Sequence, residues 1–196
     1  MADKILFRCA FYGLPGAGKS TSVQMLIEKA NLRGCWVHCI RFATPLYEAQ
    51  DIIHRLAGRP LADKNIQDGR LLNFLGGHFR SINKNALTEY FLTTEDVFTQ
   101  QYENQSISPG LLLNDDMRPS EVDFLKARHF HLTQIIATPA ACRTRRKMRG
   151  DLTLGNVNDP TEVGMETIVP DATIINDGAL SDLDAKITHF LNQIIK

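Results

Sequence analysis

Short apolar runs alternate with longer amphipathic segments along the chain, and this alternation predicts strands separated by helices. Residues 4–12 form an apolar run that ends in a glycine turn, and residues 19–31 then place apolar side chains at helical spacing. A second apolar run covers residues 35–42. The order strand, turn, helix, strand is that of a βαβ unit, so the N-terminal part predicts an α/β fold with a parallel sheet.

Helical spacing dominates the next part of the chain. Thr44 and Pro45 predict a helix start, with the Thr44 hydroxyl as the cap and proline in the first turn, and Gly58 predicts its end. The polar stretch 59–105 is mostly helical in pattern. We therefore expect a largely helical segment before the chain returns to the sheet.

The remaining apolar runs predict three more strands. They cover residues 111–113, 132–138 and 172–175. A short helix is expected over residues 121–128, and a last helix opens near Ser181, where Ser181 and Asp184 resemble a capping box.

The organisation predicted is one α/β domain that spans residues 1–196, because no repeat and no linker divides the chain. Two pieces interrupt the alternation of strands and helices. One covers about residues 43–105, and the other, which holds a run of basic residues, covers about residues 139–169. We expect both to be mobile parts of the same domain.

Composition excludes several classes of protein. The 196 residues are 43% apolar and 22% charged, which is typical of a folded domain and not of a disordered or collagen-like chain. Lys and Arg together number 22, as do Asp and Glu, so the formal net charge is zero. A nucleic-acid-binding protein usually carries a basic excess, so we expect no nucleic-acid partner. Any phosphate chemistry must come from a local cluster of charge.

The chain also lacks the signals of membrane proteins and exported proteins. No run reaches the roughly 18 apolar residues that span a bilayer, and Met1 to Lys4 lead directly into a strand with no signal peptide. Cys35 and Cys39 lie in an apolar run, which favours buried thiols over metal ligands. We expect a cytoplasmic protein with no membrane partner, and the sequence leaves a homodimer open.

The most specific motif lies in the first glycine turn. Residues Gly13, Leu14, Pro15, Gly16, Ala17, Gly18, Lys19 and Ser20 fit G-x-x-x-x-G-K-[ST] at every fixed position. Such a loop turns successive backbone N–H groups toward phosphate oxygens at the start of a helix. The Lys19 ammonium would reach the terminal phosphates of ATP, and the Ser20 hydroxyl would bind Mg²⁺.

Two other interpretations of this turn were weighed. A glycine-rich turn without function is one, but a predicted strand before it and a predicted helix after it favour the phosphate loop. A dinucleotide-binding loop is the other, and it would need glycine where Thr21 stands. We therefore predict that residues 13–21 bind ATP.

Two further clusters carry charge suited to phosphoryl transfer. Asp115 and Asp116 end a predicted buried strand, where an acid can hold a magnesium-bound water or orient the acceptor, and we expect Asp115 to be the acid on the metal side. The alternative is that they cap the next helix, for which Ser120 is better placed.

The second cluster is a run of arginines on one helical face. Three-residue spacing relates Arg143, Arg146 and, less regularly, Arg149. They would neutralise the transferring group from a mobile lid, although a solvated basic face or a nucleic-acid patch remains an alternative.

Taken in order along the chain, these segments resemble those of nucleoside monophosphate kinases, and most closely the deoxynucleoside monophosphate kinases common in phages. The resemblance spans nearly the whole chain, but only the phosphate loop is highly specific. It rests on Gly13 to Thr21, Phe42-Ala43-Thr44-Pro45-Leu46, Asp116-Met117-Arg118 with Glu121, residues 143–149, Thr161-Glu162 and Ile175-Asn176-Asp177-Gly178.

The resemblance implies a three-layer P-loop NTPase fold with a parallel five-stranded sheet, an acceptor-binding insertion and a lid. It also implies that Phe42 begins the acceptor-binding insertion and that Arg80 and Arg118 meet the acceptor. Asp116 would act in catalysis together with Lys19 and the lid arginines. Tyr47 departs from the family pattern, which often has a basic residue there, and this puts the identity of the acceptor in doubt.

The main hypothesis is ATP- and Mg²⁺-dependent transfer of a phosphoryl group to a (deoxy)nucleoside monophosphate. A second hypothesis is a kinase for another small phosphorylated acceptor, such as phosphomevalonate. A third is a nucleotide-dependent switch that binds ATP or GTP and signals to a partner without transfer. The two separate arginine regions weigh against the switch, since a switch needs no acceptor site.

Overall fold

The computed structural model describes residues 4–63, 65–106, 109–153 and 164–195. Five strands form one sheet in the order β2-β3-β1-β4-β5, and every neighbouring pair is parallel. The strands are β1 (Leu6–Tyr12), β2 (Trp36–Cys39), β3 (Gly110–Asn114), β4 (His131–Ile136) and β5 (Ala172–Ile175).

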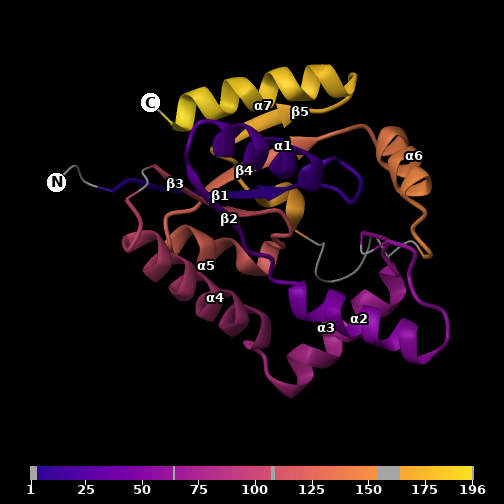
Figure 1. Ribbon diagram of the computed structural model, residues 1–196. Helices are drawn as coiled ribbons and strands as arrows, with labels where there is room; N and C mark the ends of the chain where they lie inside the picture. Colours follow the sequence, from indigo (N-terminus) through magenta and orange to yellow (C-terminus); the bar gives the residue numbers. More distant parts are fainter. Residues whose placement is uncertain (1–3, 64, 107–108, 154–163, 196) are drawn as a thin grey trace.

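Helices cover both faces of this sheet and make three layers (Figure 1). One face carries α1 (Lys19–Leu32) and α7 (Leu180–Ile194), and the other carries α4 (Ala86–Glu103) and α5 (Val122–Ala127). The remaining helices lie toward the carboxyl ends of the strands. These are α2 (Thr44–Leu56), α3 (Gly69–Ile82) and α6 (Pro139–Arg149), together with two 3₁₀ turns at Pro119–Glu121 and Met165–Thr167.

The sheet is buried on both sides, which explains why its strands are continuous apolar runs. Phe11 and Leu113 point toward α1 and α7, where Phe11 meets Phe190 edge to face at a ring-centroid distance of 5.7 Å. Tyr12 and Leu112 point to the opposite layer, under α4 and α5. The central strands are therefore fixed by packing on both faces.

Strand register brings the predicted functional segments to one edge of the sheet. Ala10 of β1 lies opposite Asn114 of β3, so the glycine loop after β1 and the acids after β3 leave the sheet at the same end. Cys39 of β2 lies opposite Leu113, which brings the segment after β2 to the same place. This is the carboxyl edge of a parallel sheet, where ligands of α/β proteins bind.

Element positions follow the sequence prediction, with changes at several ends. The strand expected over residues 35–42 is shorter, because β2 ends at Cys39 and the chain then turns toward α2. The strand expected at residues 132–138 lies at residues 131–136. Among the helices of the described residues, none is both long and apolar enough to cross a bilayer.

Two predicted helix caps are wrong. Thr44 is the first residue of α2 and not its cap, and its hydroxyl donates to the Arg41 carbonyl at 3.1 Å. The pair Ser181 and Asp184 does not open α7. Asp182 does so by accepting the N–H of Ala179 at 3.0 Å. In both places the helix begins one or two residues before the position that the capping pattern indicated.

Candidate active site

The glycine loop lies between β1 and α1 and adopts a conformation that needs glycine. Gly13, Gly16 and Gly18 have φ of 142°, 88° and 105°, values that other residues rarely adopt. A Cβ on Gly13 would stand 2.2 Å from the Ile135 carbonyl oxygen, and one on Gly16 would stand 2.5 Å from the Cys142 carbonyl oxygen. The sequence motif is therefore a folded loop held closely by β4 and α6.

Lys19 and Ser20 begin α1 directly after this loop. The Lys19 ammonium donates to the carbonyls of Gly13 at 2.8 Å and Leu14 at 3.3 Å, which holds it across the loop. Ser20 and Thr21 are exposed to the adjoining cleft. Gly18 has no side chain to cap the helix, so the first amides of α1 face the position where a phosphate would bind.

These residues fit ATP and Mg²⁺. The loop offers backbone N–H groups and an ammonium for anionic phosphates, and the Ser20 hydroxyl is a hard oxygen ligand of the kind Mg²⁺ prefers. Both kinds of group line one cleft of about 1410 Å³, which has room for two small ligands. The cleft extends from the loop to the helices between β2 and β3.

The acids after β3 have different partners. Both carboxylate oxygens of buried Asp115 accept from Arg41, whose Nε and Nη2 lie 2.6 and 2.9 Å away. Asp116 accepts the N–H groups of Phe42 at 3.1 Å and Ala43 at 2.8 Å. Neither acid caps a helix. Asp115 as a metal ligand stays a prediction, since in this structure its oxygens hold a guanidinium.

The ionisation of Asp116 is shifted by its surroundings. Burial raises the pKa of its carboxyl to about 6, and the neighbouring Asp115 charge adds to the shift. The N–H groups of Phe42 and Ala43 and the amide of Asn114, at 2.7 Å, oppose it by stabilising the carboxylate. Asp116 thus binds the first residues of the segment after β2 through a carboxylate whose ionised form is disfavoured by burial and by Asp115.

The predicted acceptor-side residues Phe42, Arg80 and Arg118 all line the cleft. Phe42 is buried and stacks on Phe91 with ring centroids 4.3 Å apart, so its ring is part of the cleft floor. Arg80 Nη2 lies 3.6 Å from buried Glu121, which also accepts the backbone N–H of Arg118 at 2.8 Å. Glu121 therefore brings the two arginine positions together.

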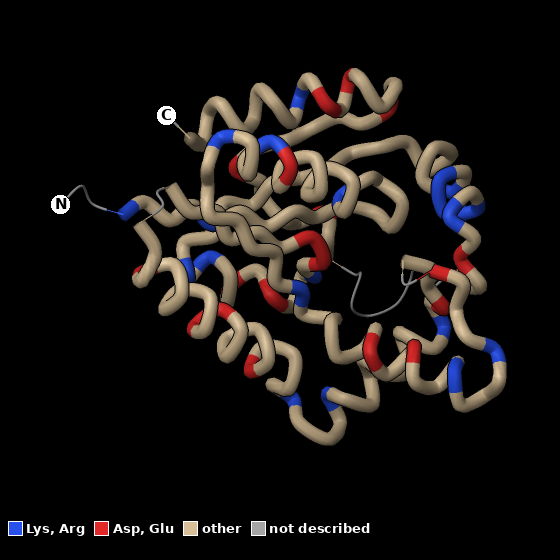
Figure 2. The backbone as a smooth tube through the Cα atoms, in the orientation of Figure 1, with Lys and Arg blue, Asp and Glu red and all other residues tan. Residues whose placement is uncertain are grey.

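The arginine helix α6 packs on the phosphate loop, and Figure 2 shows basic positions gathered along this helix. Arg146 is buried with its Cγ close enough to Gly16 that a Cβ there would stand 2.9 Å away. Arg145 and Arg149 also line the cleft, whereas Arg143 is exposed and lies outside its lining. In this structure α6 turns residues 145, 146 and 149 toward the loop, and a lid role for Arg143 stays a prediction.

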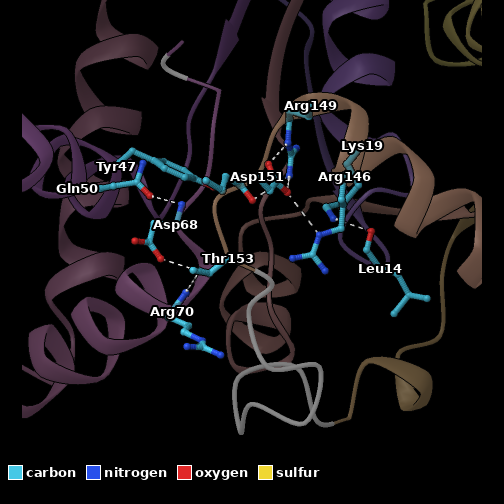
Figure 3. A network of polar contacts seen from close by, with 11 residues as sticks. Leu14, Lys19, Tyr47, Gln50, Asp68, Arg70, Arg146, Arg149, Asp151 and Thr153 are labelled. Carbon is cyan, nitrogen blue, oxygen red and sulfur yellow. Dashed lines mark hydrogen bonds and ion pairs between the residues drawn. The ribbon is translucent and has the colours of Figure 1, made fainter. Parts of the chain in front are cut away.

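The end of α6 is joined to the start of α3 by a set of contacts that we term the clasp (Figure 3). The Thr153 hydroxyl donates to Asp68 at 2.6 Å and accepts from the Arg70 N–H at 2.9 Å.

The arginines of α6 make the other contacts of the clasp. Arg149 donates to Gln67 at 3.1 Å. Buried Asp151 accepts from Arg149 at 2.6 Å and lies 3.5 Å from Arg146 Nε. The two pieces predicted to be mobile are thus in direct contact.

Sequence reasoning missed several residues of the cleft. Arg41 was passed over although it directly precedes Phe42 at the end of a predicted strand, and Arg145 was passed over in favour of three-residue spacing. An i, i+4 search would have paired Arg145 with Arg149.

Tyr47 lies in the cleft, where burial and the nearby acids raise its pKa to about 12. Its hydroxyl stays protonated at neutral pH and accepts from Gln67 at 3.1 Å.

One segment of the family resemblance is not tested. Thr161 and Glu162 lie outside the residues that the structure describes. Of the segment expected to form the lid, the structure describes α6, residues 150–153 and residues 164–169.

Comparison with known proteins gives the fold. No family model matches the chain, and no curated protein matches it. The APS kinase of Mycobacterium tuberculosis, solved with AMPPNP and APS, is 13% identical over 98% of each chain, with a TM-score of 0.50. TT1252 from Thermus thermophilus is 16% identical over 98% of this chain and 99% of that one, with a TM-score of 0.48.

A shikimate kinase from Acinetobacter baumannii, solved with shikimate, is 18% identical over 97% of this chain and 96% of that one, with a TM-score of 0.45. At these identities the likeness concerns architecture alone. The chain has the expected three-layer α/β fold with a five-stranded parallel sheet, and it shares this architecture with the APS kinase.

Proposed function

We propose that this chain transfers the terminal phosphoryl group of ATP, with Mg²⁺, to a (deoxy)nucleoside monophosphate. One observation carries the proposal: a single cleft extends from the loop after β1 to a region that Arg41, Arg80 and Arg118 line. The loop suits a polyphosphate, and a separate group of arginines suits an acceptor that is itself a phosphate ester. A switch that binds one nucleotide would need only the first part.

The residues divide between donor and acceptor. The backbone amides of residues 14–20 and the Lys19 ammonium would hold the donor phosphates, and Ser20 would bind Mg²⁺, which supplies positive charge to the transferring phosphoryl group. Arg80 and Arg118 would meet the acceptor phosphate. Glu121 fixes the position of both by its contacts with the Arg80 guanidinium and the Arg118 N–H.

Transfer itself asks the protein mainly for position and charge. Negative charge accumulates on the equatorial oxygens of the phosphoryl group, and Lys19 and Arg146, which both line the cleft beside the loop, would neutralise it. Closure of α6 over the loop would exclude water, which otherwise competes with the acceptor. Arg143 is kept as a predicted lid residue, although Arg145 and Arg149 are better placed here.

The central test is substitution of the phosphate-loop lysine. Lys19→Ala should fold normally and lower turnover by at least about 100-fold, because it removes the cation that neutralises charge in the transition state. Lys29→Ala is the matched control: Lys29 lies on the same helix but pairs with Asp184 of α7, and its loss should leave turnover unchanged. Coupled ADP release measures both. Normal turnover in folded Lys19→Ala would overturn the assignment.

The acceptor is tested with a panel of ribo- and deoxynucleoside monophosphates in the same assay. Transfer to at least one of them, above the background of ATP alone, is the expected result. No ADP with any nucleotide, but ADP with a phosphorylated non-nucleotide such as phosphomevalonate, would move the proposal to the second hypothesis. Tight ATP binding without transfer to any acceptor would favour the switch.

A further inference from the structure

One segment of the sequence pattern has no place in the reaction described above. It is Ile175-Asn176-Asp177-Gly178, which begins at the last residue of β5 and leads toward α7. Asn176 is buried, with 6% of its surface exposed, and its side chain lies beside the cleft. A buried amide is expected to be hydrogen-bonded, so its partners indicate its role.

The Asn176 side chain binds the phosphate loop. Its Nδ2 donates to the carbonyl of Ala17 at 2.7 Å, across a sequence separation of 159 residues. Arg145 of α6 joins the same group: Nη1 donates to the Ala17 carbonyl at 3.3 Å, and Nη2 donates to the Asn176 carbonyl at 2.9 Å. One carbonyl of the loop is thus held by two side chains from elements far away in the sequence.

The adjoining residues make the same segment rigid. Asn176 donates its backbone N–H to the Ile136 carbonyl at 2.7 Å, and Asp177 accepts the N–H of Thr138 at 2.6 Å. Both contacts tie the segment to the end of β4 and the start of α6. The Asn176 side chain therefore projects from a fixed backbone and not from a free loop.

Holding the Ala17 carbonyl has a direct consequence for the next N–H group. A trans peptide unit is planar, with its C=O and N–H on opposite sides. Two donors that fix the Ala17 oxygen therefore also turn the Gly18 N–H the other way, away from Asn176. Gly18 lines the cleft directly before α1, so its N–H belongs to the group that would bind the donor phosphates.

The fit between Gly18 and Asn176 supports this arrangement. Gly18 has a φ of 105°, and a Cβ on it would stand 2.3 Å from Asn176 Nδ2. A glycine at this position is thus required by the contact with Asn176 as well as by the backbone. The P-loop glycine and the asparagine after β5 form one packing unit.

We infer that Asn176 is a positioning residue for the donor, which orients the phosphate loop by holding the Ala17 carbonyl, with Arg145 as its second support. The inference rests on the proposed function, since it assumes that the loop binds ATP. Asn176 need not touch the nucleotide. It acts by keeping one peptide unit of the loop in the orientation that binding requires. Nucleotide binding then loses less free energy to ordering the loop.

The test compares Asn176→Ala and Asn176→Asp with the wild type. Alanine removes the donor, and aspartate keeps the shape but sets a carboxylate against the Ala17 carbonyl. We expect the dissociation constant for Mg²⁺-AMPPNP, measured by calorimetry, to rise at least about tenfold with alanine and further with aspartate. The KM for the acceptor should stay within about twofold, because the acceptor side of the cleft is untouched.

The control is Asn192→Ala, an exposed asparagine on α7, which should leave both constants unchanged. If Asn176→Ala does not fold, Asn176→Ser and Arg145→Ala take its place, since the shorter serine removes the amide donor and Arg145 is the second donor to the Ala17 carbonyl, at a half-buried position. Unchanged AMPPNP affinity in the folded variants would overturn the inference, as would an equal loss of donor and acceptor affinity. Absence of AMPPNP binding to the wild type would instead overturn the proposed function, and the inference with it.

Discussion

Asp116 shows how one side chain at the site combines a structural and an electrostatic role. Its oxygens hold the N–H groups of Phe42 and Ala43, and through them the beginning of the segment that leads to α2. Because burial and Asp115 raise its pKa to about 6, the native protein binds this proton more tightly than the unfolded chain does, whose aspartates titrate near pH 3.9. Stability must therefore depend on pH in this range.

The sign of the dependence follows from linkage. The contribution of Asp116 is complete below about pH 4 and is lost as the pH rises through about 6, with a slope of at most about 1.4 kcal/mol per pH unit. Asp116→Asn should abolish this slope. Urea unfolding between pH 4 and 7 measures it, with the exposed Asp123→Asn as control. Equal slopes in the wild type and Asp116→Asn would contradict the prediction.

Single residues were predictable where the chemistry dictates their type. The loop from Gly13 to Ser20 has a spacing that few other structures require, and it forms the expected turn. Arg143 shows the limit, because the face that a helix buries depends on what packs against it. Contact with the phosphate loop selects Arg145 and Arg146 instead, and no pattern within α6 contains that information.

At the scale of elements, the clasp is the feature that connects the two arms of the cleft. Gln67 and Asp68 precede α3, which carries Arg80, whereas Arg149 and Thr153 end the segment that carries the lid arginines. The clasp therefore places Arg80 of α3 and the arginines of α6 on one connected framework. Under the proposed function, it couples a bound acceptor to closure over ATP.

Thr153→Val tests this coupling with almost no change in volume. The variant loses the hydroxyl that donates to Asp68 and accepts from the Arg70 N–H. We expect the acceptor KM to rise several-fold and the ratio of ATP hydrolysis to phosphoryl transfer to increase, because a looser clasp admits water. Steady-state assays with and without acceptor measure both quantities.

The control for the clasp is Thr93→Val on α4, where an exposed threonine bonds only to the preceding helical turn. It should leave acceptor KM and the hydrolysis ratio at wild-type values. If Thr153→Val matches this control, the clasp does not take part in the reaction.

Elements were predicted better than their ends. Apolar periodicity located every strand of the sheet, because burial on both faces leaves little choice of residue there. The helix caps were harder to predict than the strands. Ser181 and Asp182 both suit a helix start, and the choice between them depends on where the connection from β5 ends. The clasp could not be foreseen, because it joins Asp68 to a residue 85 positions away.

At the scale of the whole molecule, one aromatic cluster connects the cleft to the layer beneath the sheet. Phe91 of α4 stacks on Phe42 and meets Phe124 and Phe130 edge to face at 5.7 and 5.8 Å. It is completely buried. The part of the cleft that Phe42 lines is therefore continuous with the hydrophobic core, and the two should lose order together.

Phe91→Ala should lower the free energy of unfolding by about 3–5 kcal/mol, from lost burial and the cavity left behind. Phe74→Ala is the matched control: Phe74 is 67% exposed on α3, so its loss should change stability by no more than about 0.5 kcal/mol. Chemical denaturation compares the two. A similar effect of both substitutions would show that the Phe91 cluster does not stabilise the fold.

The contact between Asn176 and Ala17 also determines when the nucleotide site is complete during synthesis. The phosphate loop is made more than 150 residues before the side chain that holds its Ala17 carbonyl. The loop between β1 and α1 therefore reaches its final conformation only after β5 and Asn176 have been made and have folded against it. Under the proposed function, a nascent chain that ends before β5 should bind ATP poorly, so the nucleotide would not assist the folding of the earlier half.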